Sequence, residues 1–201
     1  MDITTTANIF REQIKKYIVF NEDEWALFCK NLSFTTLKKR KHFIEPGKVC
    51  DNIGFIISGS VRYYNIKDSE EITGYFSFEN EFVSSYKSFL TRLPGLNYIQ
   101  ALEDTELINI SYANMQKMLA NPILAYKMER FGRLVAENYL ICYEDRMVSF
   151  ITQTPEERYL DLLNTGGDII RRMPQHYIAN FLGITAVSLS RIRRRVMKLA
   201  S

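Results

Sequence analysis

The sequence has few of the residues that bind metals or catalyse reactions. Its 201 residues include two histidines, His42 and His176, and three cysteines, Cys29, Cys50 and Cys142, none of them in a CxxC pair. Zinc and iron–sulfur sites need cysteine or histidine at short spacings, and histidine is the commonest general acid or base. A Gly-rich phosphate loop and paired carboxylates are also missing. The sequence therefore predicts no metal site and no enzyme, and we expect the cysteines to be buried, reduced thiols.

Long apolar runs are missing too. No run approaches the roughly 20 residues that cross a bilayer, and the opening MDITTTANIF lacks the basic and then apolar pattern of a secretion signal. Nine glycines, five prolines, 46% hydrophobic residues and 24% charged residues are typical of a globular chain of one or two domains. We therefore expect a cytoplasmic protein with no membrane partner.

What the sequence does have is a basic C-terminal segment. Residues 158–201 hold eight lysines or arginines and two acidic residues, whereas the other 157 residues hold 18 basic and 21 acidic side chains. An asymmetry of this kind indicates a polyanionic partner for the C-terminal segment alone.

The first 110 residues change from helical to strand-like patterns. Residues 6–31 are typical of two short helices, and Asn21 and Glu24 have the spacing of a capping box. Across residues 34–110, short runs of β-branched and aromatic residues alternate with turn sequences. This pattern predicts a small β-barrel or β-sandwich.

A long helix is predicted at residues 121–151, opened by Asn121 and Pro122. One stripe along it has the alternating spacing of a coiled-coil seam, and we expect it to form a homodimer interface. Its residues are Leu124, Met128, Phe131, Val135, Asn138 and Cys142. A second stripe, which repeats every seven residues, consists of Leu134, Ile141 and Val148. One stripe could pack on its own chain while the other meets a second copy, or the helix could pack only within its own chain.

The segment YIANFLGITAVSLSRIRRR, residues 177–195, has the pattern of a helix-turn-helix. Ile178 and Leu182 mark the buried face of a short helix, Gly183 ends it, and Thr185 can cap a second helix. A second helix that carries several arginines can enter a major groove and neutralise phosphates. The segment therefore predicts binding to double-stranded DNA.

Individual roles follow from position on the second helix. Arg191 is the predicted base reader, with a phosphate clamp as its alternative role. Ala186 and Val187 could touch thymine methyl groups and favour an A·T-rich site. The residues predicted to contact DNA are Thr185, Ala186, Val187, Ser188, Ser190, Arg191, Arg194, Arg195 and, at the start of the first helix, His176.

Taken together, these segments resemble the Crp/Fnr family of bacterial transcription regulators over nearly the whole chain. NEDEWALFCKNL and KKRKHFIEPGKVCDNIGFIISGSVRYY look like the opening of the family's cyclic-nucleotide-binding-type barrel, and ALEDTELINISYANMQKML resembles the stretch that closes it. The family's DNA-reading motif is similar to IANFLGITAVSLSRIRRR.

The resemblance implies an α+β fold in three parts. They are a double-stranded β-helix or jelly-roll effector domain at residues 1–120, a dimerisation helix at 121–151 and a helix-turn-helix, winged-helix-like domain at 152–201. It also implies a homodimer that reads a near-palindromic DNA site, with RNA polymerase as a further partner. A wing would have to come from residues 165–173.

The chain departs from the family in the phosphate-binding cassette. Ser84 and Ser85 fall near the family's Gly-Glu pair, Gly95 falls about where its arginine belongs, and Arg92 is the nearest cation. A buried cyclic phosphate needs a paired charge, so we expect no cyclic nucleotide, and the effector, if there is one, is an unknown small molecule. The candidate effector pocket comprises Phe76, Phe78, Ser84, Ser85, Tyr86, Arg92 and Tyr98, with simple core packing as the alternative for its aromatic residues.

A function of another class stays open. The chain could be a ligand-sensing signalling module whose C-terminal motif binds a protein partner instead of DNA. In that case, replacement of Arg191, Arg194 and Arg195 by alanine would leave its effect intact.

Overall fold

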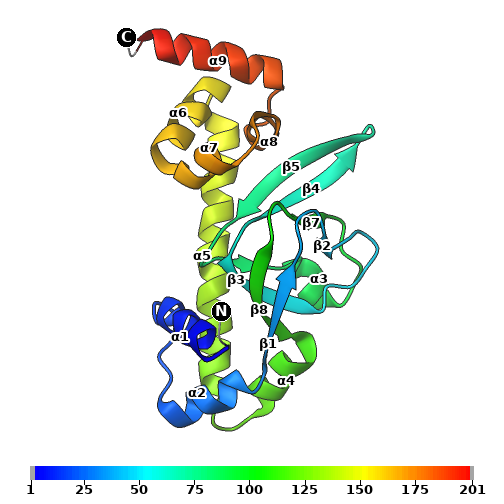
Figure 1. The fold of residues 1–201 in the computed structure, drawn as a ribbon, viewed down its shortest axis with the longest axis vertical. Helices are drawn as coiled ribbons and strands as arrows, with labels where there is room; N and C mark the ends of the chain where they lie inside the picture. The colour runs from blue at the N-terminus through cyan, green and yellow to red at the C-terminus, as the bar shows by residue number, and fades with distance from the viewer. Residues whose placement is uncertain (1–2, 200–201) are drawn as a thin grey trace. The chain divides into compact units, whose positions relative to one another are not determined.

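A computed structural model describes residues 3–199 and divides into two compact units (Figure 1). The barrel unit comprises the chain up to Tyr63 together with Ser77–Tyr139, and the C-terminal unit comprises Tyr64–Phe76 together with the chain from Leu140 onward. The long helix is thus shared between the two units and does not form a segment of its own.

The strands form two four-stranded sheets, with the orders β1-β8-β3-β6 and β2-β7-β4-β5. They are β1 (Leu32–Leu37), β2 (His42–Ile44), β3 (Asn52–Ser58), β4 (Val61–Lys67), β5 (Glu70–Ser77), β6 (Phe82–Val83), β7 (Tyr98–Ala101) and β8 (Thr105–Ser111). Strand β8 pairs antiparallel with both β1 and β3, with Leu32 and Ile53 both opposite Ile110. The predicted α+β fold with a β-barrel or β-sandwich is confirmed.

Two groups of apolar side chains build the barrel unit. One group comes mostly from strands of both sheets, with Cys50 and Phe89 added from outside the strands: Ile44, Cys50, Ile56, Val61, Val83, Phe89, Ile99 and Leu107. The other group joins the opposite face of β3 and β8 to the helices. It includes Phe10, Phe28, Phe55, Ile108, Met118, Leu124, Met128 and Phe131. Alternate residues of β8 therefore face different cores, as the two-residue period of a strand requires.

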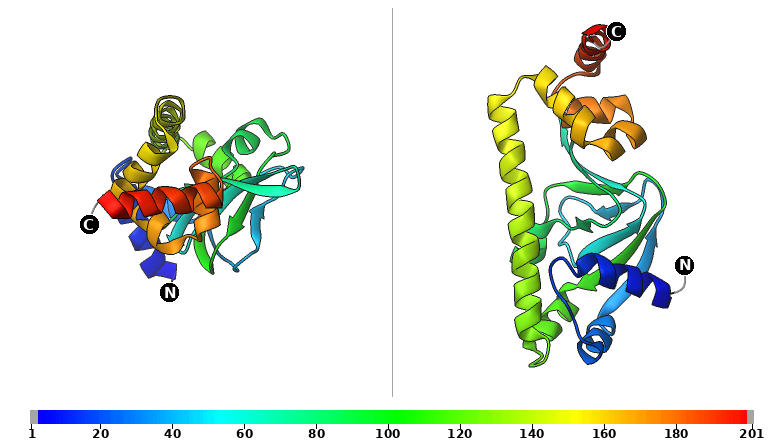
Figure 2. Two further views of the ribbon diagram at one scale, coloured as in Figure 1. Left: turned by 90° about the horizontal axis from the view of Figure 1, so that it is seen from above. Right: turned by 90° about the vertical axis from the view of Figure 1, so that its left-hand side faces the viewer.

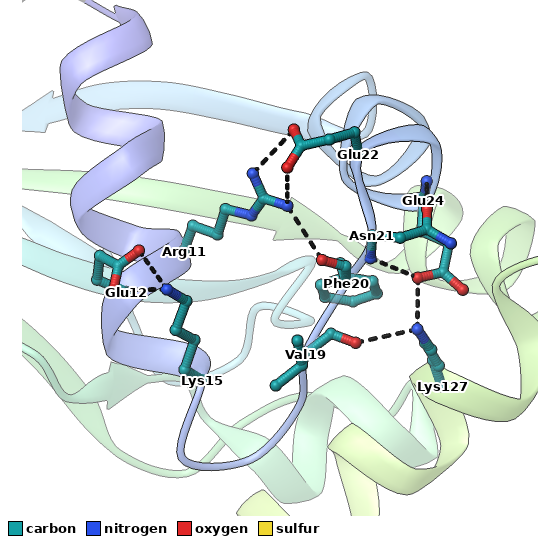
Figure 3. Close-up of polar contacts among 9 residues, drawn as sticks. All are labelled: Arg11, Glu12, Lys15, Val19, Phe20, Asn21, Glu22, Glu24 and Lys127. Carbon is teal, nitrogen blue, oxygen red and sulfur yellow. Dashed lines mark hydrogen bonds and ion pairs between the residues drawn. The ribbon is translucent and has the colours of Figure 1, made fainter.

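The N-terminal helices α1 (Ile3–Ile14) and α2 (Glu22–Cys29) pack on this second core. The predicted capping box is confirmed, since Asn21 accepts a hydrogen bond from the Glu24 backbone and the Glu24 carboxylate accepts one from the Asn21 backbone. The connecting loop is held by two cations (Figure 3): Arg11 bonds Glu22 at 2.9 Å, and Lys127 donates to the Val19 carbonyl at 2.9 Å. The Arg11 hydrogen bond lowers the pKa of Glu22.

Helix α3 (Tyr86–Thr91) lies between β6 and β7, and α4 (Tyr112–Ala120) follows β8. The long helix α5 (Ala125–Thr152) then begins after a turn in which the Asn121 side chain accepts from the Ile123 backbone at 2.9 Å. Regular helix starts a few residues later than predicted because Asn121 caps this turn and not α5 itself.

The C-terminal unit is helical beyond Thr152 (Figure 2). Its helices are α6 (Pro155–Thr165), α7 (Gly167–Arg172), α8 (Gln175–Phe181) and α9 (Ala186–Leu199). A capping box between Thr154 and Glu157 opens α6 and lowers the pKa of Glu157. Helix α7 occupies the segment in which a wing would have to lie, and residues 152–199 as described contain no strand.

The three cysteines have different environments. Cys50 is buried and Cys29 half-buried, but Cys142 is exposed on α5. The prediction of buried thiols is therefore wrong for Cys142, because no other part of the described chain covers that turn of the helix. Within residues 3–199, no helix is both long and apolar enough to cross a membrane, and no three histidine, cysteine or acidic residues are grouped to hold a metal ion.

Candidate nucleic-acid interface

Helices α8 and α9 have the arrangement predicted for a helix-turn-helix. Ile178 and Leu182 of the first half of the motif are at most 5% exposed, as are Leu189 and Ile192 of α9. Residues 189 and 192 lie about one turn apart on α9 and so share one face. The opposite face of α9 is left to solvent.

The turn between the helices depends on Gly183. Its φ of +71° lies in the left-handed region, which glycine adopts without steric cost. Its N–H donates to the Asn180 carbonyl at 2.9 Å, and the Ile184 N–H donates to the Ala179 carbonyl at 3.0 Å. A Cβ at position 183 would also lie 2.8 Å from the Phe150 ring. Both the backbone conformation and the close approach therefore require glycine here.

Thr185 caps α9, as the sequence predicted. Its hydroxyl oxygen accepts a hydrogen bond from the Ser188 backbone at 3.1 Å and lies 3.0 Å from the Ser188 hydroxyl. This bond satisfies one of the free N–H groups of the first turn. The Thr185 side chain is thus used to start the helix.

The side chains predicted to contact DNA lie largely on the exposed face of α9. Val187 is 61% exposed. Ala186, Ser190, Arg191, Arg194 and Arg195 are also exposed, whereas Ser188 is half-buried. His176 is exposed at the start of α8, with its ring centroid 4.1 Å from that of Tyr177.

The arginines of α9 differ in their contacts. Arg195 bonds the Glu156 carboxylate of α6, with its Nε 2.9 Å from Oε2. Across residues 3–199, no hydrogen bond or ion pair engages the guanidinium of Arg191 or Arg194. These two guanidinium groups are therefore available to bind an external anion.

A stack of arginine and phenylalanine side chains holds the turn of the motif in place. The Arg146 guanidinium lies 3.9 Å from the Phe181 ring centroid and 4.9 Å from that of Phe150, and it donates to the Phe181 carbonyl at 2.8 Å. Arg158 lies 4.7 Å from the Phe150 centroid and donates to the Leu182 carbonyl at 3.1 Å. The two arginines thus satisfy carbonyls at the C-terminal end of α8, where cations are favoured. Burial lowers the pKa of Arg146.

Sequence reasoning missed this stack. Arg146 and Phe150 are four residues apart on α5, so their pairing on one helix face was visible. Their contact with Phe181 was not, because it joins segments that are distant in the sequence. Arg158 was counted with the DNA-binding charge, but the structure directs its guanidinium to backbone carbonyls of its own chain.

The predicted dimer seam requires a correction. Leu124, Met128 and Phe131 are 1–3% exposed in the core of the barrel unit, and Val135 packs against that core. Because their own chain covers Leu124, Met128 and Phe131, these three side chains are not available to a second copy. Farther along the helix, Asn138 and Cys142 are exposed.

The other side of α5 carries exposed apolar residues. They include two residues of the second predicted stripe, and their exposed fractions run from 48% to 76%. The residues are Leu140, Ile141, Met147, Val148 and Ile151. Leu134, the remaining residue of that stripe, is half-buried.

Comparison with known proteins shows what this fold is similar to. No protein-family model matches the sequence, and no curated protein matches it. Among solved structures, the c-di-GMP-responsive global regulator CLP of Xanthomonas campestris has a TM-score of 0.67 at 16% identity, covering 87% of this chain and 91% of its own. A CooA mutant from Carboxydothermus hydrogenoformans has a TM-score of 0.64 at 18% identity, covering 90% and 82%. FixK2 from Bradyrhizobium japonicum has a TM-score of 0.64 at 18% identity, and the match covers 84% of this chain and 86% of FixK2.

The fold is that of the Crp/Fnr regulators. The neighbours share this fold at low identity, and the match spans both units of this chain. The resemblance drawn from the sequence is therefore confirmed for the fold.

Within this Crp/Fnr fold, the stretch that replaces the nucleotide cassette is occupied by internal contacts. Arg92, in a left-handed conformation at the end of α3, bonds the Cys50 carbonyl at 2.9 Å, pairs with Asp51 and stacks 4.2 Å from the Tyr112 ring centroid. Ser84 donates to the Asn52 carbonyl at 3.0 Å. The cation nearest to the missing cassette arginine is thus used to fix α3.

The remaining residues of the predicted effector pocket have other neighbours. Ser85 bonds the Asn97 side chain at 3.1 Å, and Tyr98 packs on His42. Phe76 belongs to the C-terminal unit, where its ring lies 5.6 Å from that of Phe181. Phe78 is buried. Tyr86 lines a groove of the barrel unit together with residues of α4, α5 and the strands β3, β6 and β8.

Proposed function

We propose that this chain is a sequence-specific, DNA-binding transcription regulator that acts as a homodimer. The observation that carries the proposal is the exposed face of α9. There, Arg191 and Arg194 have no hydrogen-bond or ion-pair partner among residues 3–199, while the apolar side chains of Ile178, Leu182, Leu189 and Ile192 beneath them are buried. Two neighbouring guanidinium groups on one exposed face repel each other and favour a polyanion. One fold neighbour, CLP, is described as a global regulator, which favours the same class of function.

The residues divide into two roles. Exposed Arg191, one turn into the helix, would bond a guanine edge in the major groove, and exposed Ala186 and Val187 before it would contact thymine methyl groups. Arg194, one turn farther along, would neutralise a phosphate. His176 at the start of α8 would contact the backbone beside them.

The homodimer would form through the exposed apolar side of α5. Leu140, Ile141, Met147, Val148 and Ile151 repeat with the spacing of a helix pair, so two copies can bury them against each other. Two recognition helices on one dimer read two half-sites, and the linked contacts strengthen binding well beyond one helix.

An effector would be a small molecule other than a cyclic nucleotide. Arg92, the nearest cation to the cassette, already bonds the Cys50 carbonyl and pairs with Asp51, and apolar side chains from the two sheets form a buried cluster. RNA polymerase is the further partner that a promoter-bound regulator would contact.

Selection from a random duplex library tests the proposal. We expect the purified chain to enrich a near-palindromic, A·T-rich site. Arg191→Ala should cost about 1–3 kcal/mol at that site and relax the preference at one base pair of each half-site.

The matched control is Arg171→Ala, which removes an equally charged, exposed residue of the same unit that is paired with Asp168. It should leave the selected site unchanged. A library with no enriched half-site would contradict the proposal and favour a protein partner for the motif.

A further inference from the structure

The barrel unit carries an open groove between α3, α4 and the first half of α5. Its volume is about 580 Å³, and most of its lining is apolar. Both size and lining are typical of sites for small organic ligands.

The groove has a buried floor and an exposed apolar mouth. Phe89 and Met128 line its interior and are at most 2% exposed. Tyr86, Leu90 and Tyr126 lie at the mouth, and their exposed fractions are 43%, 55% and 74%. Large apolar side chains gathered in this way around a hollow mark a binding surface, whereas scattered ones do not.

Gly132 leaves space in the wall that α5 contributes. It is a glycine in the interior of a helix, where alanine would favour the helical state. A Cβ built at this position meets no atom within 4 Å. The wall of the groove is therefore open beside Gly132, and a side chain introduced there would project into free space.

The charge at the mouth favours an anion. Three charged residues of α5 line it: Glu129, Arg130 and Arg133. Arg133 pairs with Glu137 at 2.5 Å, but in the described part of the chain the Arg130 guanidinium has no hydrogen-bond or ion-pair partner. A carboxylate at the mouth would give Arg130 a charge-assisted hydrogen bond.

We propose that this groove binds a medium-chain monocarboxylate, with the hydrocarbon chain along the apolar lining and the carboxylate at Arg130. The site differs from the degenerate nucleotide cassette, because its lining among the described residues does not include Ser84, Ser85 or Arg92. Binding itself is a property of the barrel unit, and only its use as an effector signal rests on the proposed function.

Titration calorimetry of the full chain with decanoate tests the site. We expect decanoate to bind and decanol, which lacks the charge, to bind about tenfold more weakly, as loss of one charge-assisted hydrogen bond predicts. Arg130→Gln should weaken decanoate by a similar factor and leave decanol unchanged. Gly132→Leu should weaken binding of both, because its side chain would occupy the part of the groove beside residue 132.

The control is Gly132→Ala, which adds one methyl group and should bind decanoate as the parent does. Both glycine variants should keep or raise the melting temperature. Equal binding of decanoate by the parent and Gly132→Leu, or no binding by the parent, would overturn the proposal. So would a lower sedimentation mass for Gly132→Leu, because the groove would then be covered by a second copy.

The DNA affinity of the same variants separates this proposal from the proposed function. Without ligand, Gly132→Leu and Arg130→Gln should bind the selected duplex like the parent. If the chain binds decanoate but no duplex, the result supports the proposed carboxylate site and contradicts the proposed DNA-binding function.

Discussion

Arg191 and Arg195 lie one turn apart on α9, but they differ in what they contact. Arg195 shares its guanidinium with Glu156, whereas Arg191 has no partner among the described residues. Exposed ion pairs contribute little to stability, typically about 0–1 kcal/mol. The main effect of the pair with Glu156 is therefore to hold the Arg195 guanidinium beside α6. Glu156 also places a negative charge beside the surface proposed to meet DNA.

Removal of that carboxylate should tighten DNA binding. Glu156→Gln frees Arg195 to bind a phosphate, so we expect a several-fold higher DNA affinity. The slope of log affinity against log salt concentration should become steeper by about 0.9 for each protomer. Fluorescence anisotropy at several salt concentrations measures both quantities. Glu12→Gln on α1 makes the same change in net charge and should have no effect. An unchanged slope for Glu156→Gln would show that Arg195 does not reach the duplex.

For single residues, the sequence predicted the contacts that form between residues close together in the chain. The caps at Asn21 and Thr185 were visible, because a cap joins a side chain to a backbone N–H two or three positions away. The stack of Arg146 and Arg158 on Phe150 was not visible as a unit, since its geometry depends on where α6 and α8 pack. Counting the basic residues of the C-terminal segment therefore overstated the charge that is free to meet DNA.

Helix α5 was predicted from the sequence, but the side expected to form the dimer packs in the core and the other side is exposed. The seven-residue repeats were real, but both sides of the helix carry one. The side that begins with Leu124 and Met128 packs on its own chain, whereas Ile141 and Val148 on the other side are exposed. The spacing of apolar residues shows which face of a helix is apolar. It does not show whether that face packs on its own chain or on a second copy.

The exposed side of α5 gives a prediction for assembly. Ile141→Glu with Val148→Glu should convert the homodimer to monomers in analytical ultracentrifugation, because like charges would face each other across the helix pair. The DNA affinity should fall with it, since one helix contacts a single half-site.

Two other changes on apolar residues separate assembly from folding. Leu163→Glu, at a position on α6 that is 39% exposed, should leave the sedimentation unchanged. Phe131→Glu should instead lower the stability by several kcal/mol, because it places a charge in the core. A dimer that survives the change at residues 141 and 148 would contradict the proposed interface.

For the whole molecule, the resemblance of several segments to the Crp/Fnr family predicted the fold. Turn sequences, a capped long helix and a glycine-centred helix-turn-helix occur in an order that few architectures share, and the solved neighbours have the same fold. The candidate effector pocket was not predictable in this way. Its seven residues lie near one another in the sequence, but the chain directs Phe76 and Arg92 to separate contacts. The groove beside Gly132 was missed because it is formed by three helices that no local pattern connects.

The central claim is that Arg191 and Arg194 of α9, which have no hydrogen-bond or ion-pair partner among the described residues, contact a DNA duplex. The most direct measurement is the slope of log affinity against log salt concentration for the parent and for Arg194→Ala, on the selected site and on unrelated DNA. If Arg194 contacts one phosphate in each half-site, its removal lowers the slope by about 0.9 for each protomer, on both kinds of DNA. An Arg194→Ala slope equal to that of the parent would contradict the account.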